Sequence, residues 1–324
     1  MDMPRTKGRL PLLWFLTGTI GDALMALALC NELAEMNSGL TSTLLVRKNA
    51  QLVKDLAKFV PFMQVEVVSF SPWPLLRLII ASMHPWQLMS AWKNEGGLRG
   101  KLRNVFLLNP HTQIVRFDIH QPASARDMVA PYDMSKLVID NFRVMAQTVG
   151  LSTRPVGSPT SMPIAAVLPS SFNVKSNSYI VVHPFGSNDL KSLPPERCRS
   201  ILKALGDANP QLSFVVTGGK QDGAAIEKII EGLPRTQAAI GLPILEVAGL
   251  IQHAVLYIGV DTGVTHLAAM MGKRVLALEH PTMPRWFPTY NPKTVMLKSE
   301  PDAREGVWGI SDARVLAEVS AMLV

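Results

Sequence analysis

The sequence predicts an α/β protein built from two domains of alternating strands and helices. Its 324 residues, 48% of them hydrophobic, suffice for two domains of ordinary size. Short apolar runs alternate along the chain with segments of helical spacing, the pattern of a parallel sheet with helical crossovers. Residues 150–178 are rich in Ser, Pro and Thr and lack periodicity, as expected for a linker. We therefore expect domains at residues 1–155 and 156–324, facing each other across a cleft.

In the first half, strands and helices alternate from the start. We predict strands at residues 10–16, 43–46, 65–70, 106–108 and 113–117, and helices at residues 22–36, 51–59 and 135–149. Arg5, Lys7 and Arg9 before the first apolar run resemble the start of a secretory signal. The run soon meets Gly18 and Gly21, and no small-x-small cleavage site closely follows it. We therefore interpret the run as a first buried strand.

Residues 71–105 depart from this alternation. Residues 75–92 form an apolar segment rich in Leu, Ile, Met and Trp. The cations in and after it, with only Glu95 opposing them, are Arg77, Lys93, Arg99, Lys101 and Arg103. An apolar face with Trp and flanking cations is typical of a helix that lies on an anionic membrane, so residues 72–103 are a candidate membrane contact. A core helix followed by a solvated basic loop fits the same residues.

The second half restarts the alternation. We predict strands at residues 179–182, 212–217, 255–260, 274–278 and 294–297, and helices at residues 194–205, 222–230, 244–253 and 311–323. Ser311 is the expected N-cap of the terminal helix, which has Asp312 in its first turn. That helix could pack back on the first domain.

The central stretch of this half is residues 255–278. An apolar run is followed by Asp261-Thr262-Gly263, and then by the apolar positions of one helical face up to Gly272. In such a strand–turn–helix unit, ligands lie at the carboxyl end of the strand, and the helix start suits a phosphate. Asp261, Thr262 and His266 would then surround that phosphate. The alternative is that Asp261 or Thr262 only caps the helix.

The net charge indicates what kind of partner the protein binds, and the cysteine content indicates the redox state of its compartment. The formal net charge of +7 favours an anionic partner, whether a nucleotide, an acidic membrane surface or nucleic acid. Cys30 and Cys198 lie far apart and in no metal-ligand spacing, which suggests a reducing compartment and no disulfide framework.

Four segments resemble glycosyltransferase family 9, the heptosyltransferases of lipopolysaccharide core assembly. They are I-G-D (residues 20–22), H-P-F-G-S-N-D-L-K-S-L-P-P-E (183–196), V-V-T-G-G (215–219) and G-V-D-T-G-V-T-H-L-A-A (259–269). The resemblance spans most of the chain and is strongest in the second half. It implies two facing Rossmann-like domains, the GT-B arrangement. The first domain would bind the acceptor, and the second would hold the nucleotide-sugar.

The resemblance also assigns expected roles to the first two segments. Asp22, next to Gly21, matches the family's catalytic base at a turn facing the cleft; its alternative role is an N-cap. Lys191 matches the family's lysine and would contact the donor's phosphates or sugar, with Ser187 of the same motif beside the donor. A solvated loop lysine is the alternative for Lys191.

The remaining matches concern the donor. Thr262 and Gly263 would offer N–H groups and a hydroxyl to the diphosphate, while Asp261 and His266 would contact the sugar. His266 could instead be a hydrogen-bonded structural histidine. The residues assigned to the nucleoside are Gly218 and Gly219, which allow close approach, and Asp222 or its neighbour Gln221, which would bind the ribose.

The chain departs from the family pattern at three places. Ala28 stands where the family usually has proline, and Leu193 replaces the tryptophan of the lysine motif. Glu279-His280-Pro281 stands where the family commonly reads Phe-Gly-Pro. This last change brings an acid and His280 beside the donor, so the resemblance alone does not establish ADP-heptose as the donor.

Together these patterns predict an inverting, metal-independent glycosyltransferase. It would need no cofactor beyond a nucleotide-sugar donor, ADP-linked by the resemblance, and would act on a lipopolysaccharide-core or other anionic glycan or glycolipid. We expect a cytoplasmic protein, peripheral on the inner face of the inner membrane if residues 72–103 bind lipid. A nucleic-acid-modifying glycosyltransferase and a non-catalytic nucleotide-sugar-binding protein are the alternatives.

Overall fold

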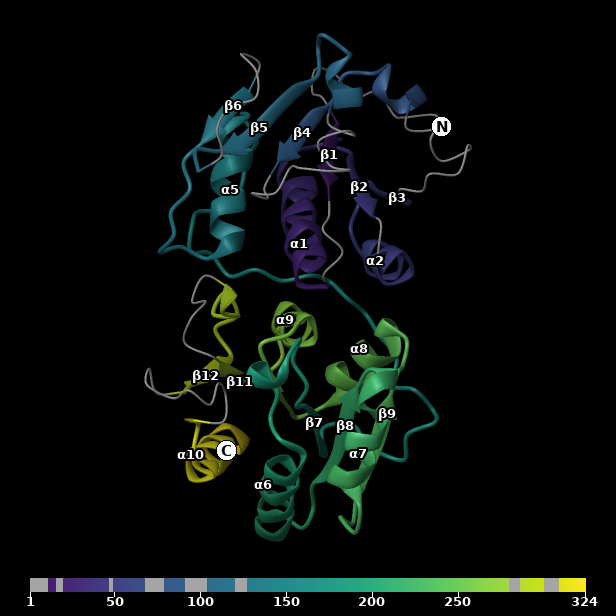
Figure 1. Ribbon diagram of the computed structural model, residues 1–324, viewed down its shortest axis with the longest axis vertical. Helices are drawn as coiled ribbons and strands as arrows, with labels where there is room; N and C mark the ends of the chain where they lie inside the picture. The colour runs from purple at the N-terminus through teal and green to yellow at the C-terminus, as the bar shows by residue number, and fades with distance from the viewer. Residues whose placement is uncertain are drawn as a thin grey trace. The chain divides into compact units, whose positions relative to one another are not determined.

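The computed structural model describes residues 11–15, 20–46, 49–67, 79–90, 104–119, 127–279, 286–299 and 309–324. The chain divides into two compact units, residues 1–158 and 159–324. Within the described residues each unit has a six-stranded parallel sheet with helices packed on it, which confirms the predicted α/β fold with two Rossmann-like units (Figure 1).

The sheet of the first unit has the strand order β3-β2-β1-β4-β5-β6. Its strands are β1 (Leu12–Phe15), β2 (Ser42–Val46), β3 (Met63–Val67), β4 (Gln87–Ser90), β5 (Gln113–Phe117) and β6 (Asp127–Ala130), and its helices are α1 (Ile20–Met36), α2 (Ala50–Ala57) and α5 (Val138–Thr148). The chain builds one side of the sheet outward from β1 and then returns to the other side with β4. This order is that of the Rossmann fold, whose topological switch point lies between β1 and β4.

Two predictions for this unit are wrong. Within the predicted helix 75–92, β4 is a buried strand that pairs in parallel with β1 and β5. Residues 106–108 are not a strand, because residues 104–107 form a helical turn. Phe106 packs edge-on against Trp86, with ring centroids 6.0 Å apart. Both errors have one cause: these runs are apolar on every face, so no period distinguishes strand from helix.

The predicted membrane segment falls mostly outside the described residues, which include only 79–90 of it. No helix in the described parts of the chain is both long and apolar enough to cross a bilayer.

The sheet of the second unit has the same kind of order, β12-β11-β10-β7-β8-β9. Its strands are β7 (Tyr179–His183), β8 (Ser213–Gly218), β9 (Thr236–Ile240), β10 (Leu256–Val260), β11 (Val275–Glu279) and β12 (Thr294–Lys298). Its α-helices are α6 (Pro195–Ala208), α7 (Gly223–Ile230), α8 (Ile244–His253), α9 (Gly263–Met270) and α10 (Asp312–Leu323), and two short 3₁₀ helices are η1 (Asp189–Lys191) and η2 (Lys220–Asp222). The switch point therefore lies between β7 and β10.

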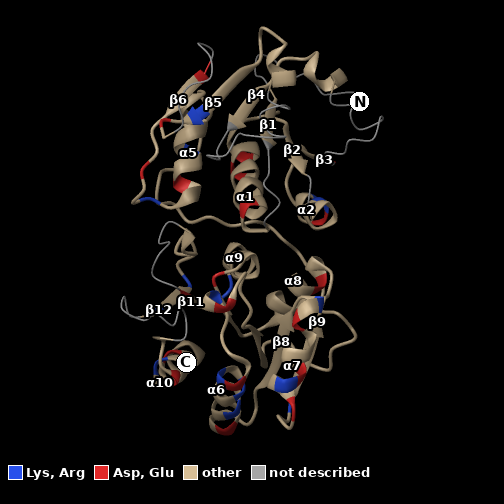
Figure 2. Cartoon of the chain, in the orientation of Figure 1, with Lys and Arg blue, Asp and Glu red and all other residues tan. Residues whose placement is uncertain are grey.

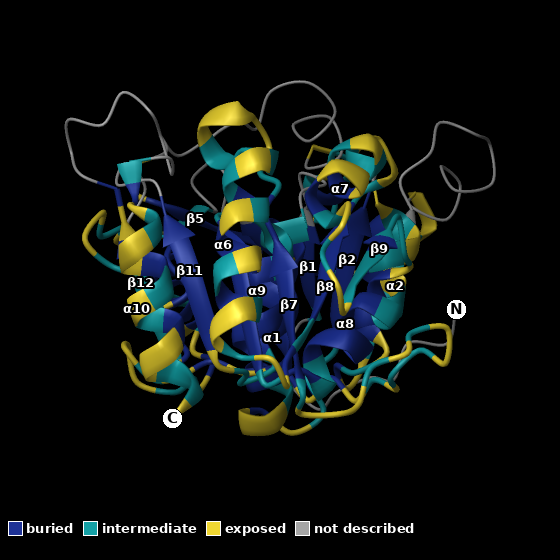
Figure 3. Ribbon diagram, turned by 90° about the horizontal axis from the view of Figure 1, so that it is seen from below, coloured by how far each residue is buried: buried dark blue, intermediate teal, exposed yellow. Residues whose placement is uncertain are grey.

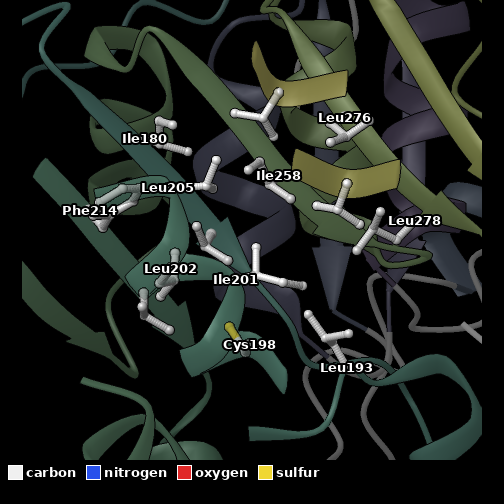
Figure 4. Packing of buried hydrophobic residues seen from close by; sticks show 14 of the residues in the cluster. Ile180, Leu193, Cys198, Ile201, Leu202, Leu205, Phe214, Ile258, Leu276 and Leu278 are labelled. Atoms are coloured by element: carbon white, nitrogen blue, oxygen red, sulfur yellow. The ribbon is translucent and has the colours of Figure 1, made fainter. Parts of the chain in front are cut away.

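Alternate strand residues of this unit face two different helix layers. Ile180, Ile258, Leu276 and Leu278 belong to an apolar core with residues of α6, α7 and α10 (Figure 4). Because side chains alternate along a strand, their sequence neighbours face the α8 and α9 side. The strands are buried, whereas the outer face of α6 is exposed (Figure 3).

The terminal helix α10 belongs to this second core. Val315 and Val319 are buried in it, and α10 packs on α6 of the same unit. Ser311 accepts a hydrogen bond from the Arg314 N–H, so it is the N-cap that the sequence indicates.

Residues 159–178 have no regular secondary structure, as expected of the linker, but they pack on the second unit. The Thr160 N–H donates to the Tyr290 carbonyl at 3.1 Å, and the Met162 N–H to the Met270 carbonyl at 2.9 Å. Gly249 of α8 allows the Val167 carbonyl to approach, because a Cβ there would lie 2.0 Å from that oxygen. This segment is therefore part of the second unit's packing.

Candidate functional site

The carboxyl ends of β7 and β10 define the candidate site, because ligands of such sheets bind where the strand order reverses. The loop after β7 contains Ser187 and Lys191, and the turn after β10 contains Asp261 and Thr262. Four of the predicted donor-site residues thus follow two neighbouring strands.

The loop after β7 is folded so that Lys191 points back to the sheet edge. The Gly186 N–H donates to the Ser192 hydroxyl at 2.9 Å, and Asn188 caps η1 by accepting from the Lys191 N–H at 3.1 Å. A Cβ on Gly186 would lie 2.5 Å from the Lys191 carbonyl oxygen, so this turn needs glycine.

Lys191 and Asp261, 70 residues apart in sequence, form an ion pair between Nζ and Oδ2. Both side chains are partly buried, with 28% and 16% exposed. Lys191 is therefore not a solvated loop lysine, which was the alternative interpretation. The pair sets a cation and an anion side by side between the ends of β7 and β10.

Thr262 is the N-cap of α9. Its hydroxyl accepts a hydrogen bond from the Thr265 N–H at 3.4 Å, so the capping alternative holds for this side chain. The Thr265 hydroxyl donates to the Val260 carbonyl at 2.5 Å, which fixes the helix start on its strand. A Cβ on Gly259 would lie 2.7 Å from the Thr265 hydroxyl, so glycine permits this close packing. The first N–H groups of α9, beginning with Gly263, have no partner within the helix.

His266 is a buried, hydrogen-bonded histidine, as the alternative interpretation proposed. Its Nδ1 lies 2.9 Å from the Tyr290 hydroxyl, and 4% of the residue is exposed. Burial lowers its pKa to about 4, so the imidazole is neutral near pH 7. With Nδ1 bound to Tyr290, a ligand contact would use Nε2.

Asp222 stabilises its own loop. Its Oδ2 accepts from the Gly219 N–H at 2.7 Å and from the Gln221 side-chain amide at 3.0 Å. A Cβ on Gly218 would lie 2.9 Å from the Asp222 Cβ and from the Phe185 ring, so glycine lets this loop close. The loop follows β8, next to β7, and so lies one strand away from the switch point.

Two further buried ionisable residues lie at the same edge; the sequence placed the acid Glu279 beside the donor but gave His183 no role. Glu279 ends β11 with 2% of the residue exposed, and burial and the nearby Asp261 raise the pKa of its carboxyl well above the ordinary value. His183 ends β7, and burial lowers its pKa to about 4. Its Nδ1 has no hydrogen-bond partner among the described residues. Neither burial nor a missing partner is visible in a sequence, although both residues end apolar runs.

Asp22 lies at the corresponding edge of the first unit. Helix α1, which follows β1 at the first switch point, begins at Ile20, so Gly21 and Asp22 are in its first turn. Asp22 is the third helical residue, not the N-cap, and it is buried, with 8% of the residue exposed. An acid in this turn interacts favourably with the helix dipole. Of the other predicted residues, Ser187 is exposed and His280 lies outside the described residues.

No group of three or more His, Cys, Asp and Glu side chains in the described parts of the chain is arranged to hold a metal ion.

The fold and this edge define a Rossmann-type protein with a lysine, carboxyls and a helix start gathered at its switch point. The model of glycosyltransferase family 9 (heptosyltransferase) matches residues 116–306, more than half of the chain. The chain therefore belongs to this family and is a heptosyltransferase-like glycosyltransferase.

Solved structures of similar fold include three bacterial proteins at low sequence identity. E. coli ADP-heptose lipopolysaccharide heptosyltransferase II has 16% identity and a TM-score of 0.75, covering 97% of this chain and 98% of that chain. E. coli heptosyltransferase WaaC with ADP has 15% identity and a TM-score of 0.73, with coverage of 97% and 100%. A family 9 glycosyltransferase from Veillonella parvula has 14% identity and a TM-score of 0.77, with coverage of 97% and 97%. Comparison with curated proteins gave no significant match.

Proposed function

We propose that this glycosyltransferase moves a sugar, heptose or another, from a nucleotide-diphosphate sugar to a lipopolysaccharide-core or other anionic glycan, with inversion at the anomeric carbon. The main observation behind this is the Lys191–Asp261 pair beside the fixed start of α9. ADP, which the similar structure of WaaC contains, is the nucleotide we expect.

In this mechanism Asp22 is the general base. It takes the proton of the acceptor hydroxyl as that oxygen bonds to the anomeric carbon, while the bond from this carbon to the diphosphate oxygen breaks. The leaving diphosphate keeps the electron pair and gains negative charge. Lys191 and the free N–H groups at the start of α9 stabilise that charge electrostatically, so no divalent metal is needed.

Contacts already made within the site determine which atom of each side chain remains to bind the donor. The Thr262 hydroxyl already accepts from the Thr265 N–H, so it would donate its own proton to a phosphate oxygen. Asp222 uses Oδ2 for its loop, which leaves Oδ1 for a ribose hydroxyl. Asp261 and the Nε2 of His266 would contact the sugar, and Gly21, Ser187 and His280 would complete the donor's surroundings.

Nucleotide-dependent thermal stability tests the donor site. We expect ADP to raise the melting temperature of the parent, because a ligand that binds only the folded state stabilises it. Gly263→Val should abolish that rise, since a branched side chain at the first residue of α9 crowds the phosphate. The same measurement with UDP and GDP shows which nucleobase the site prefers.

The matched control is Gly206→Ala in α6 of the same unit, where a Cβ would lie an ordinary 3.5 Å from Phe214. It should keep the full ADP-dependent rise. An equal rise in Gly263→Val would place the nucleotide elsewhere, and the absence of any rise in the parent would contradict the donor site.

We also propose that the protein works in the cytoplasm and touches the inner face of the inner membrane through its first unit. Met83 and Leu108 are 72% and 81% exposed. The Asn109 side chain donates to the Met83 carbonyl at 2.8 Å, so these two segments are adjacent. Ile79 and Ile80, also exposed, precede Met83. This apolar patch favours a lipid contact. The mixed charge along α6 and α7 argues against a nucleic-acid acceptor (Figure 2).

Liposome binding tests the membrane contact. Replacing Met83 and Leu108 together by Gln should weaken co-sedimentation with anionic vesicles by about 10-fold or more, because burial of each such side chain contributes about 1.5–3 kcal/mol. Val167→Gln in the second unit is the control, since Val167 is 85% exposed. Equal loss in both variants, or none in either, would rule out this patch as the membrane contact.

A further inference from the structure

Glu279 is a buried acid that faces the candidate site. Val260 of β10 pairs with Leu278 of β11, so the next residues, Asp261 and Glu279, lie side by side at the sheet edge. The Leu278 side chain belongs to the core on the α6 side (Figure 4). By strand alternation Glu279 therefore faces the α8 and α9 side, where His266 of α9 lies.

The charged groups around Glu279 are engaged with other residues. Its charged neighbours are Asp261 from the β10 turn, Lys191 from η1 and Lys298 from β12. Lys191 is paired with Asp261, and the Lys298 Nζ lies 4.8 Å above the Phe287 ring. No hydrogen bond from a described residue reaches the carboxyl. The carboxyl of this largely buried residue is therefore available to a ligand at the sheet edge.

Two further titratable groups near this carboxyl are Tyr290 and Tyr257, whose pKa values are raised by burial and by Glu279. The neutral His266 lies on α9, on the same side of the sheet. Burial and the adjacent Asp261 carboxylate both favour the protonated form of Glu279. In its protonated form this carboxyl offers one O–H donor and one carbonyl acceptor.

The order of the strands indicates which part of the donor lies here. Along the edge, the glycine loop of Gly218 and Gly219 follows β8, Lys191 follows β7, Thr262 follows β10 and Glu279 ends β11. If the nucleoside lies over the glycine loop and the diphosphate at the start of α9, the sugar extends toward β11.

We propose that Glu279 is the specificity-determining residue for the sugar of the donor, and that its carboxyl both donates to and accepts from one sugar hydroxyl. This inference rests on the proposed donor site. A hydroxyl matches a neutral carboxyl because each group can donate and accept at once. A sugar without that hydroxyl would leave the acid unpaired again, and a sugar carrying a carboxylate would be repelled by Asp261.

Two substitutions separate this role from a structural one. Glu279→Gln keeps a donor and an acceptor, whereas Glu279→Leu keeps only the volume. Calorimetry on the parent would measure the dissociation constants of ADP, ADP-heptose, UDP-glucose and GDP-mannose. The sugar nucleotide that binds most tightly would then be compared with its own nucleoside diphosphate in each variant. We expect Glu279→Leu to lose about 10- to 100-fold in affinity for the sugar nucleotide and none for the diphosphate. Glu279→Gln should stay within about 3-fold of the parent.

A pH series supplies the second measurement. In the parent, affinity for the sugar nucleotide should fall as Glu279 loses its proton on the alkaline side, and this fall should be absent in Glu279→Gln. Glu279→Leu should also melt at a higher temperature than the parent, because it removes a largely buried acid at the end of an apolar strand. A carboxyl that only supports the fold would show the opposite shift.

Glu227→Leu on the exposed face of α7 is the control and should change neither affinity. If the parent binds a nucleoside diphosphate but Glu279→Leu retains the full affinity for its sugar form, Glu279 does not select the sugar. If the parent binds none of these nucleotides, the donor site itself fails, and this inference fails with it.

Discussion

Replacing Asp22 by asparagine is expected to lower the turnover number by about 10²–10⁴-fold, because asparagine keeps the shape of the side chain but cannot accept a proton. Donor affinity should change little, since the residues proposed to hold the diphosphate, Lys191 and the start of α9 at Thr262, are in the other unit. The measurement is steady-state turnover together with a direct titration of the donor.

Stability distinguishes this role from a local one. Asp22 is the third residue of α1, where a carboxylate near the helix start is worth about 0.3–1 kcal/mol. Asp22→Asn should therefore lower the melting temperature only slightly. Glu35→Gln is the control on the same helix, because Glu35 is exposed and pairs with Arg154 at 2.8 Å. Turnover close to that of the parent in Asp22→Asn would remove this residue from the mechanism and leave the chain without an identified base.

Most helices and strands could be predicted from the spacing of apolar residues. The wrong predictions fall where the apolar residues have no regular spacing. Strands such as β7 and β10 are β-branched runs bounded by polar turns, and they lie close to the predicted positions. β4 was assigned to a helix because a parallel strand covered on both faces is apolar throughout. β9 and β6 were not predicted, because T-Q-A-A-I and D-M-V-A lack the composition of strong strands.

For the site, the sequence supplied residues but not their partners. Lys191 and Asp261 were each predicted as donor contacts, yet their ion pair depends on β7 and β10 being neighbours in the sheet. Glu279 appeared in the sequence only as a departure from the family pattern. Its burial, and the lack of a hydrogen bond to its carboxyl from the described residues, depend on how β10 and β11 pack beneath α9. Sequence motifs indicate which side chains lie at the ends of strands. The burial of a carboxyl and its contacts depend on the packing of neighbouring strands and are seen only in the structure.

The largest effect on stability is expected at Arg143 of α5, which is fully buried. Its guanidinium donates to Glu32 of α1 at 2.8 Å, to Asp140 at 2.8 Å and to the Ser158 carbonyl at 2.9 Å. Arg143→Met removes the cation and leaves two buried carboxyls close together. We expect the free energy of unfolding to fall by about 3–5 kcal/mol, since breaking a buried pair leaves uncompensated charge.

The same network holds the end of the first unit. Glu32 also accepts from the Arg154 N–H at 2.7 Å, and Asp140 accepts from the Gly157 N–H at 2.8 Å. Because both carboxyls lose their cation in Arg143→Met, the segment of residues 154–158 should also become more susceptible to limited proteolysis. The cleavage should precede global unfolding, since few apolar contacts hold such a chain segment.

Two further variants show whether charge or packing is responsible. Arg154→Met breaks the half-exposed pair with Glu35 and should cost no more than about 1 kcal/mol. Combining Arg143→Met with Glu32→Gln and Asp140→Asn removes the uncompensated carboxylates, so denaturant titration should show much of the lost stability restored. If the triple variant is as unstable as Arg143→Met alone, the loss comes from packing around the guanidinium and not from buried charge.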